Sequence, residues 1–348
     1  MLNRSNNSAA RYAQIEEDLR KRILSGEFAG GTALPGELFL CASYGVSRKT
    51  VRKALENLRT QNFIRKHQGC GNFVIPATER EKLPRCMGKA AVMLPGDFAE
   101  NPFAGELLAG IYKSASLNNV QISVLPQDTS CASLLEMYYN FEIDAFLWGA
   151  LPESLPEAVT ELAQRKIPQV VVNFKIPGTG AVLYDSYPAW RAVLNCFRAA
   201  GHKYAAFIDH SRQNAWISSR RQAFLEAADS CGMRGVIVPV ENEQMLKDFI
   251  LNERKCSAYI TVKSYTAAFL EAAPPGVTRA EFTPDEISGD PDVIRIHVPA
   301  QKMGFEALRL LVDNHFAEDP GAEIQVPCFA VLGLSVTPYK NIGENLCK

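Results

Sequence analysis

Long apolar runs and paired cysteines are lacking in this sequence. The uncharged apolar stretches are as short as AAVMLPG at 90–96, whereas a membrane-spanning helix needs about 20 apolar residues. The opening residues, MLNRSNNSAARY, lack the apolar core of a secretion signal. The nine cysteines are scattered and never form CxxC, which argues against a disulfide framework or a zinc knuckle. We therefore expect a cytoplasmic protein with reduced thiols, no bound metal and no membrane partner.

Catalytic motifs are lacking as well. The sequence contains no GxSxG, no HExxH and no phosphate-binding GxxxxGK loop. Its five histidines show no ligand spacing. The GCG at 69–71 and the GTG at 178–180 each precede a predicted strand, so both are interpreted as turns rather than nucleotide loops. The sequence predicts a protein that is not an enzyme and uses no cofactor.

Charge is unevenly distributed along the 348 residues. Residues 1–76 carry 12 Lys and Arg against 6 Asp and Glu, whereas the rest of the chain carries 25 against 32. A basic head on an acidic body predicts two domains with different partners. Residues 77–88 are polar and show no periodicity, which is typical of a linker. We expect a head over 1–76 and a body over 89–348.

Three helices are predicted in the head. Apolar side chains recur at helical spacing over 12–25, and a short helix is expected over 37–43 with Leu38 facing inward together with Cys41 or Leu40. Gly45 suits the end of that helix because glycine tolerates positive φ. Ser47 is a good N-cap for the next helix. The side chains of that third helix divide into an apolar stripe and a cationic face, formed respectively by Val51, Ala54, Leu55 and Leu58 and by Arg48, Lys49, Arg52 and Lys53.

A hairpin is predicted directly after the cationic helix. FIRKHQGCGNFVIP (63–76) reads as two short strands around a Gly-rich turn, which completes the order of a winged helix-turn-helix. A solvated surface is the simplest interpretation of four cations on one helix face. The neighbouring turn, cap and hairpin favour DNA binding instead, because such a helix fits the major groove, where Arg and Lys reach base edges and phosphates. We therefore expect double-stranded DNA as a partner.

The head resembles the GntR family of bacterial transcription regulators over nearly all of residues 11–76. The resemblance is carried by LPGE (34–37), GVSRKTVRKAL (45–55) and GCGNFV (69–74). It implies a helix that reads or clamps operator DNA and a wing tip that enters the minor groove. The family often has a basic residue where Leu38 stands and usually Ser or Ala where Gly36 stands, which implies that one DNA contact is missing. The DNA-binding residues expected here are Glu37, Ser47, Arg48, Lys49, Thr50, Arg52, Lys53, Gln68 and Gly69.

Apolar runs alternate with helical segments throughout the body. The predicted strands lie at 90–96, 120–126, 144–150, 168–174, 181–185, 204–210, 235–240 and 257–262. This alternation predicts an α/β fold in which helices cover both faces of parallel sheets. Ligands of such sheets bind beyond the carboxyl ends of the strands.

The body resembles the effector domain of the LacI/GalR repressors, a periplasmic-binding-protein-like fold of type I with two parallel-sheet lobes. The resemblance is spread over LPGDFAENPFAGELLAGI (94–111), GHKYAAFI (201–208), SSRRQAFLEA (218–227) and GFEALRLLVD (304–313). A GntR head on such a body is also the layout of the arabinose repressors. The resemblance implies a homodimer in which a small effector, a sugar or sugar derivative, closes the lobes and changes the affinity for the operator.

Polar and aromatic residues near strand ends are the candidate ligand-binding residues. Asp and Asn can hydrogen-bond to sugar hydroxyls, aromatic rings can stack on a sugar face, and Arg can bind two oxygens at once. Each of these residues can equally serve ordinary packing or surface charge. The candidates are Asp97, Phe103, Trp148, Asn173, Tyr184, Asp185, Trp216, Arg220 and Lys263.

The resemblance weakens in two places. Sugar-binding members usually carry Asn-Asp where this chain has Lys263-Ser264, and RAEFTPDEISGDP (279–291) looks too irregular for the next strand, which we expect to be reduced or lost. An acidic effector would suit Lys263 and Arg220, whereas a body that dimerises without sensing any ligand is the alternative. An enzyme fused to the head is a third interpretation, which the length of the body and the absence of a cofactor lysine motif disfavour.

Overall fold

The computed structural model describes residues 5–80, 87–94, 101–149, 156–212, 215–252, 256–274, 277–284, 293–314 and 321–331. The chain forms two compact units, one made of residues 1–89 with 132–144, the other of residues 90–131 with 145–348. None of the described helices is both long and apolar enough to cross a membrane.

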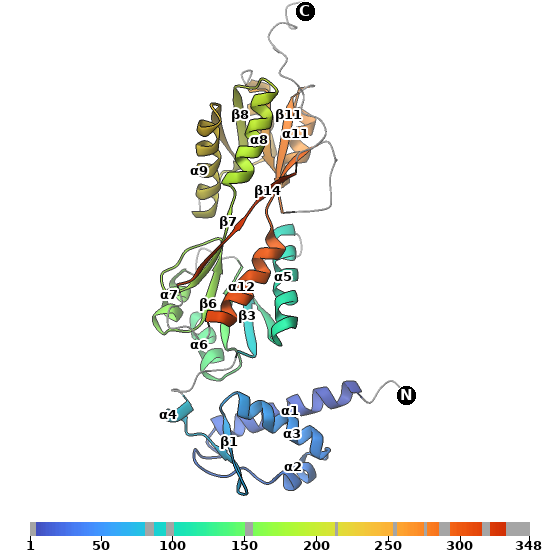
Figure 1. The fold of residues 1–348 in the computed structure, drawn as a ribbon, viewed down its shortest axis with the longest axis vertical. Helices are drawn as coiled ribbons and strands as arrows, with labels where there is room; N and C mark the ends of the chain where they lie inside the picture. Colours follow the sequence, from blue (N-terminus) through green and yellow to red (C-terminus); the bar gives the residue numbers. More distant parts are fainter. Residues whose placement is uncertain are drawn as a thin grey trace, which may run out of the picture. The chain divides into compact units, whose positions relative to one another are not determined.

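The first unit contains the predicted winged helix-turn-helix (Figure 1). Strands β1 and β2 pair antiparallel, with Ile64 opposite Val74 and His67 opposite Gly71. The first residues of the expected linker form a helical turn, α4. The elements of the head are α1 (Ser5–Leu24), α2 (Glu37–Tyr44), α3 (Arg48–Thr60), β1 (Ile64–His67), β2 (Gly71–Val74) and α4 (Ala77–Arg80).

A single apolar core holds the three helices of the head. The α3 stripe of Val51, Ala54, Leu55 and Leu58 packs in one cluster with Ile15, Leu19 and Ile23 of α1. The expectation that Leu38 faces inward is wrong, because Leu38 is 73% exposed whereas Leu40 is 1% exposed. Leu40 is buried in this core and Cys41 and Tyr44 pack partly against it, which leaves Leu38 on the opposite, exposed side of α2.

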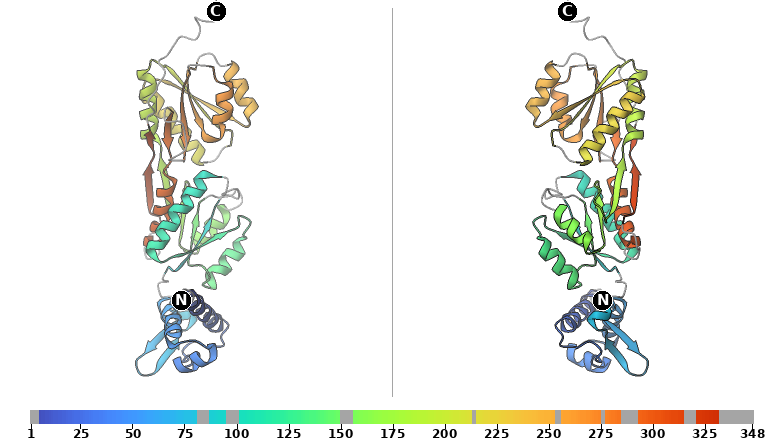
Figure 2. Two further views of the ribbon diagram at one scale, coloured as in Figure 1. Left: turned by 90° about the vertical axis from the view of Figure 1, so that its right-hand side faces the viewer. Right: turned by 90° about the vertical axis from the view of Figure 1, so that its left-hand side faces the viewer.

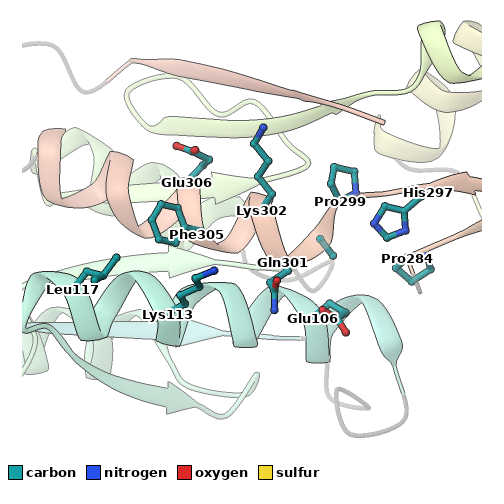
Figure 3. Close-up of a pocket in the computed structure, with 11 residues that line it drawn as sticks. Glu106, Lys113, Leu117, Pro284, His297, Pro299, Gln301, Lys302, Phe305 and Glu306 are labelled. Carbon is teal, nitrogen blue, oxygen red and sulfur yellow. The ribbon is translucent and has the colours of Figure 1, made fainter. Parts of the chain in front are cut away.

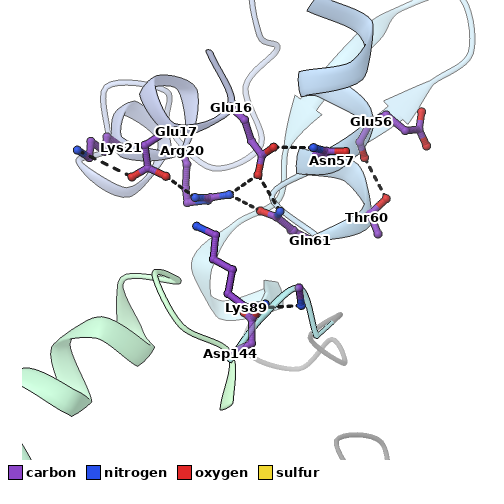
Figure 4. A network of polar contacts seen from close by, with 11 residues as sticks. Glu16, Glu17, Arg20, Lys21, Glu56, Asn57, Thr60, Gln61, Lys89 and Asp144 are labelled. Carbon is purple, nitrogen blue, oxygen red and sulfur yellow. Dashed lines mark hydrogen bonds and ion pairs between the residues drawn. The ribbon is translucent and has the colours of Figure 1, made fainter. Parts of the chain in front are cut away.

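A buried polar network also joins α1 to α3 (Figure 4). Glu16 accepts hydrogen bonds from Asn57 at 2.7 Å and from Gln61 at 2.8 Å. Arg20, which is 2% exposed, donates to Gln61 at 2.7 Å and forms an ion pair with Glu16. The pairing of these groups compensates their removal from water. The network therefore fixes the orientation of α3 on α1.

The segment after α6 (Cys131–Tyr139) packs on the same core. The ring of Phe141 lies 4.7 Å from that of Phe63, and the Arg80 guanidinium lies over both rings at 5.6 and 4.9 Å. Phe141 has a φ of +59°, a conformation that is uncommon for a residue other than glycine.

The first sheet of the second unit has the strand order β13-β7-β6-β5-β3-β4. Its β3, β5, β6, β7 and β13 pair in parallel. Helices flank both faces, and α12 packs against α5 (Figure 2). The elements of this first lobe are β3 (Lys89–Met93), α5 (Pro102–Asn118), β4 (Gln121–Leu125), β5 (Ala145–Trp148), α7 (Pro156–Gln164), β6 (Gln169–Val172), β7 (Gly180–Asp185), α12 (Ala300–Asn314) and β13 (Glu323–Pro327).

The second sheet has the strand order β14-β12-β11-β10-β8-β9, and β14 is antiparallel to its neighbour. The expectation that the strand near 279–291 is reduced or lost is wrong, because β11 pairs in parallel with both β10 and β12. The elements of this second lobe are α8 (Tyr187–Ala199), β8 (Tyr204–His210), α9 (Ala215–Ser230), β9 (Arg234–Val240), α10 (Glu243–Asn252), β10 (Ala258–Val262), a 3-10 turn (Lys263–Tyr265), α11 (Thr266–Ala272), β11 (Thr278–Thr283), β12 (Ile294–His297) and β14 (Phe329–Val331).

The described chain passes between the two sheets after β7, after β12 and after β13. The connection after β13 is tied to the end of β7 by a hydrogen bond of 2.7 Å from the Cys328 N–H to the Asp185 carbonyl. These connections are what makes the two sheets lobes of one body.

Candidate DNA interface and ligand site

The turn between α2 and α3 has the two caps that the sequence predicts, Gly45 at the end of α2 and Ser47 at the start of α3. Gly45 has a φ of 62° and ends α2 in the left-handed conformation, which costs glycine little. The Ser47 hydroxyl accepts a hydrogen bond of 3.3 Å from the Thr50 N–H and so caps α3. The cap and the core stripe together orient the opposite face of α3 toward solvent. On that face Arg48, Lys49, Arg52 and Lys53 are all exposed.

Glu37 bridges the two arginines of this face. Its Oε2 accepts from the Nε of Arg48 and from the Nε of Arg52, both at 2.9 Å. The hydrogen bond from Arg48, assisted by the one from Arg52, lowers the pKa of the Glu37 carboxyl. The two arginine side chains remain 57% and 59% exposed. Glu37 therefore orients both guanidinium groups while leaving them accessible.

The wing tip lies between β1 and β2. Gln68 and Gly69 are exposed there, and Gly69 has a φ of +77°. The ring of His67 packs edge-on against Phe73 at 4.8 Å. A side chain at Gly69 would be strained in this conformation, so glycine keeps the tip tight.

Arg220 lies in the second lobe, in a buried ion pair with Asp209. The Arg220 Nε donates to Asp209 Oδ2 at 3.1 Å, and Nη2 donates to Oδ1. Arg221 donates to the same carboxylate at 3.1 Å. Asp209 was not among the candidates from the sequence. The signal that could have revealed it is a lone carboxylate at the end of the apolar run YAAFIDH.

Two further candidates, Tyr184 and Lys263, lie on the same side of the second lobe as this pair. The ring of Tyr184 lies 6.2 Å from that of Phe282, which the Arg220 guanidinium also faces. Burial raises the pKa of Tyr184, and the charge of Arg220 opposes that shift. Lys263 follows β10, whose Thr261 pairs with Ile208 of β8, so Lys263 lies level with His210. The structure thus brings Tyr184, Arg220 and Lys263 to the carboxyl-end side of the second lobe.

The candidates of the first lobe are more dispersed. Trp148 is 1% exposed, stacks on Phe146 and donates from its indole N–H to Gln169 at 2.9 Å, so its ring belongs to the core. Asn173 directly follows β6 and has a φ of 67°, and its buried Oδ1 has no hydrogen-bond partner among the described residues. Phe103 is half-buried in the first turn of α5.

The Asp185 carboxylate accepts from the Tyr187 N–H at 3.0 Å. Asp97 and the Trp216 side chain lie outside the described residues.

A separate pocket lies between α5 and α12 and the end of β12 (Figure 3). Glu106 and Lys113 of α5 and Lys302, Phe305 and Glu306 of α12 are among its lining residues. His297 and Pro299 contribute from the connection that follows β12. None of the ligand-binding candidates whose side chains the structure describes lines this pocket.

His210 connects the Asp209 cluster to the 3-10 turn. Its Nε2 lies 3.2 Å from the Ser264 hydroxyl, and its ring lies 5.1 Å from that of Tyr265. Burial lowers the pKa of His210, and the positive charge of Arg220 acts in the same direction. The folded protein therefore favours the neutral imidazole.

This shift predicts a pH dependence of stability. His210 binds a proton more readily in the unfolded chain than in the folded protein. The contribution of His210 to the free energy of unfolding should therefore fall as the pH drops below about 6.5. Urea unfolding at about pH 7, 6 and 5 should show a shallower decline for His210→Gln than for the wild type. Parallel pH profiles for the two proteins would contradict the assignment.

These geometries define the class of the protein. A capped cationic helix beside a wing forms a winged helix-turn-helix head, and two mainly parallel sheets joined by repeated crossovers form a two-lobed α/β body. A family model described as "Bacterial regulatory proteins, gntR family" matches residues 11–74. The head is therefore a GntR-type helix-turn-helix domain.

Two curated relatives match short stretches of the chain. The mannosyl-D-glycerate transport/metabolism system repressor MngR of Escherichia coli (strain K12) is 44% identical over 63 residues, which are 18% of this chain and 26% of the relative. The transcriptional regulator TreR of Bacillus subtilis (strain 168) is 38% identical over 73 residues, 21% of this chain and 29% of the relative. The chain thus spans less than a third of the length of these relatives.

Solved structures match the body. A LacI family transcriptional regulator from Enterococcus faecium with bound ribose aligns with a TM-score of 0.58 and 18% identity, over 72% of this chain and 100% of that one. A transcription regulator-like protein from Staphylococcus haemolyticus aligns with a TM-score of 0.60 and 17% identity, over 73% and 100% of the two chains. The body has the two-lobed fold of LacI-family regulators, as the sequence predicts.

Proposed function

We propose that the protein is a sequence-specific, DNA-binding transcription regulator that acts as a repressor. In this proposal it works as a cytoplasmic homodimer, catalyses no reaction and binds operator half-sites through its two heads. A small ligand, a sugar or sugar derivative, binds the body and changes the affinity for the operator. Closure of the lobes alters the relative placement of the two heads. The heads then no longer match the fixed spacing of the two operator half-sites, so the affinity for the operator falls.

One observation carries the proposal. The cationic face of α3 is exposed, capped by Ser47 and oriented by Glu37 beside the wing tip. A helix presented in this way can enter the major groove with its N-terminal residues at the base edges. The repressors among the curated relatives share this domain, which supports the same use of it here.

The ligand part of the proposal draws on the second lobe and on its structural neighbours. Arg220 pairs with Asp209 at the end of β8, Lys263 follows β10 and the Tyr184 ring lies 6.2 Å from Phe282 of β11, which supports a ligand site at the carboxyl ends of these strands. The buried, unsatisfied Oδ1 of Asn173 is a further group that a ligand hydroxyl could satisfy. Ribose is bound to the Enterococcus faecium neighbour, which supports a sugar as the kind of ligand.

The experiment that tests the proposal begins with selection of genomic fragments that the intact protein binds. Genes beside the selected fragments indicate which sugars to try, and operator binding is then titrated in the presence of each sugar. The proposal expects tight binding to a discrete set of fragments and release by at least one sugar. Binding that is equal on selected and random fragments would contradict sequence-specific recognition.

Substitution of Arg52 separates base reading from phosphate binding. Arg52→Ala should weaken binding to the operator by about 1–3 kcal/mol more than binding to random duplex, because a lost base contact affects the cognate sequence alone. Arg309→Ala, a matched charge removal on the exposed surface of α12, should leave both affinities unchanged. Equal losses on operator and random duplex would show that Arg52 contacts phosphate and reads no base.

The alternative function is a DNA-binding dimer whose body senses nothing. The ion pair between Arg220 and Asp209 favours it, because Asp209 already occupies the Nε–Nη2 edge of this buried arginine. Operator affinity that no sugar alters would support this alternative over ligand control.

A further inference from the structure

The carboxylate of Asp209 is saturated by donors from its own lobe. Its Oδ2 accepts from Arg220 Nε and from Arg221 Nε, each at 3.1 Å. Its Oδ1 accepts from Arg220 Nη2 and from the backbone N–H of His210, the latter at 2.7 Å. A carboxylate offers about four lone-pair positions, and a donor occupies each of them here. Asp209 has no exposed surface.

Asp209 in turn occupies two of the N–H groups of the Arg220 guanidinium. Its Nε and Nη2 meet the two oxygens of Asp209 side by side, which is the arrangement that a carboxylate or phosphate of a ligand would require. The flat faces of the group lie toward Phe207 and Phe282, whose ring centroids are 5.9 and 5.5 Å from the guanidinium carbon. The Arg220 side chain is 4% exposed.

The Nε–Nη2 edge of the second arginine is also occupied from within the lobe. Arg221 donates from Nε to Asp209 and from Nη2 to the carbonyl of His210. A ligand anion that binds side-on to Nε and Nη2 of Arg220 would therefore have to displace a buried carboxylate that holds four hydrogen bonds. Displacement would leave that charge uncompensated in a region of low dielectric constant.

We infer that Asp209 is a resident counter-ion that closes the Nε–Nη2 edge of Arg220 to ligand anions, so that the effector presents no carboxylate or phosphate to this edge. The inference rests on the proposed function, because it specifies the chemical class of the effector of that same body. It favours a neutral polyhydroxy compound and opposes the acidic effector that Lys263 and Arg220 suggest in the sequence.

Calorimetry on the intact wild-type protein tests the inference without any substitution. Each neutral sugar of a panel is titrated beside its own phosphate ester and its own aldonic acid, and inorganic phosphate is included. The inference expects no anionic compound to bind more tightly than its neutral parent. An acid or phosphate ester that binds at least about tenfold more tightly than the parent sugar would overturn it.

A substitution of the counter-ion tests the same point from the other side. Asp209→Asn should bind inorganic phosphate or a sugar phosphate at least about tenfold more tightly than the wild type, because the Nε–Nη2 edge of Arg220 then lacks a charged partner. The control is the double variant Asp209→Asn with Arg220→Gln, which removes both charges and should gain no affinity. A folded Asp209→Asn protein with unchanged phosphate binding would overturn the inference, and if that variant does not fold, the wild-type panel decides.

The outcome is distinguishable from a failure of the proposed function. A wild-type protein that binds no compound of the panel, with an operator affinity that none of them alters, contradicts ligand control. The gain of phosphate binding in Asp209→Asn then still supports the counter-ion role, and its absence overturns that role.

Discussion

Raising the salt concentration from about 50 to about 200 mM should weaken duplex binding by the intact protein by roughly 10³–10⁵-fold. The reason is counterion release. Each head exposes Arg48, Lys49, Arg52 and Lys53 on one face of α3, and a dimer with two such faces should make about 6–10 phosphate contacts. Fluorescence anisotropy of a labelled duplex over a salt series measures the effect as the slope of log affinity against log salt.

Substitution of one lysine measures how much a single cation of α3 contributes to the slope of log affinity against log salt. Lys53→Ala removes one cation from each head, so the slope should become shallower by about 2 for a dimer, with similar losses on every sequence. The Arg309→Ala protein should retain the wild-type slope, since Arg309 lies on α12 of the body. A nearly flat salt dependence would show that α3 is not the phosphate-binding surface.

Substitution of Gly110 or Gly304 should destabilise the body strongly. The two glycines lie where α5 and α12 cross. A Cβ on Gly110 would lie 1.8 Å from the carbonyl oxygen of Gln301, and a Cβ on Gly304 would lie 2.0 Å from that of Leu107. Backbone atoms cannot rotate away, so the helices must separate. Gly110→Ala and Gly304→Ala should each cost about 3 kcal/mol, the upper end of typical overpacking penalties.

Gly105 provides a matched control on the same helix. A Cβ on Gly105 would meet no atom within 4 Å, and Ala is favoured over Gly in a helix by about 1 kcal/mol. Gly105→Ala should therefore leave the urea midpoint of the body unchanged or raise it. A Gly110→Ala protein as stable as Gly105→Ala would contradict the close approach of α5 and α12.

Local patterns were sufficient to predict the head. The stripe of Val51, Ala54, Leu55 and Leu58 fixes both the existence of α3 and the face that it buries, and Gly45 with Ser47 fixes where α2 ends and α3 begins. Leu38 was mispredicted because a helix as short as α2 needs few core residues. The sequence pattern cannot show which apolar position the neighbouring helices leave uncovered.

Tertiary pairing limited the prediction of the body. The strand β11 was missed because RAEFTPDEISGDP contains acidic residues and proline, whereas in the fold TRAEFT is flanked by strands on both sides. The approach of the two helices at Gly110 and Gly304 joins segments far apart in the sequence. Asp209 looked like an ordinary strand end, because its partner Arg220 is identified only when α9 is placed beside β8. Trp148 is an aromatic residue at a strand end, but both faces of β5 are buried, so its ring lies in the core.

The most direct test of the central claim compares two proteins on one selected operator fragment. In the variant, Arg48, Lys49, Arg52 and Lys53 are all replaced by Ala, and its folding is checked by circular dichroism because these side chains lie outside the head core. We predict a loss of operator affinity of at least roughly 100-fold, from lost base and phosphate contacts. An operator affinity equal to that of the wild type would contradict the assignment of α3 as the DNA-binding helix.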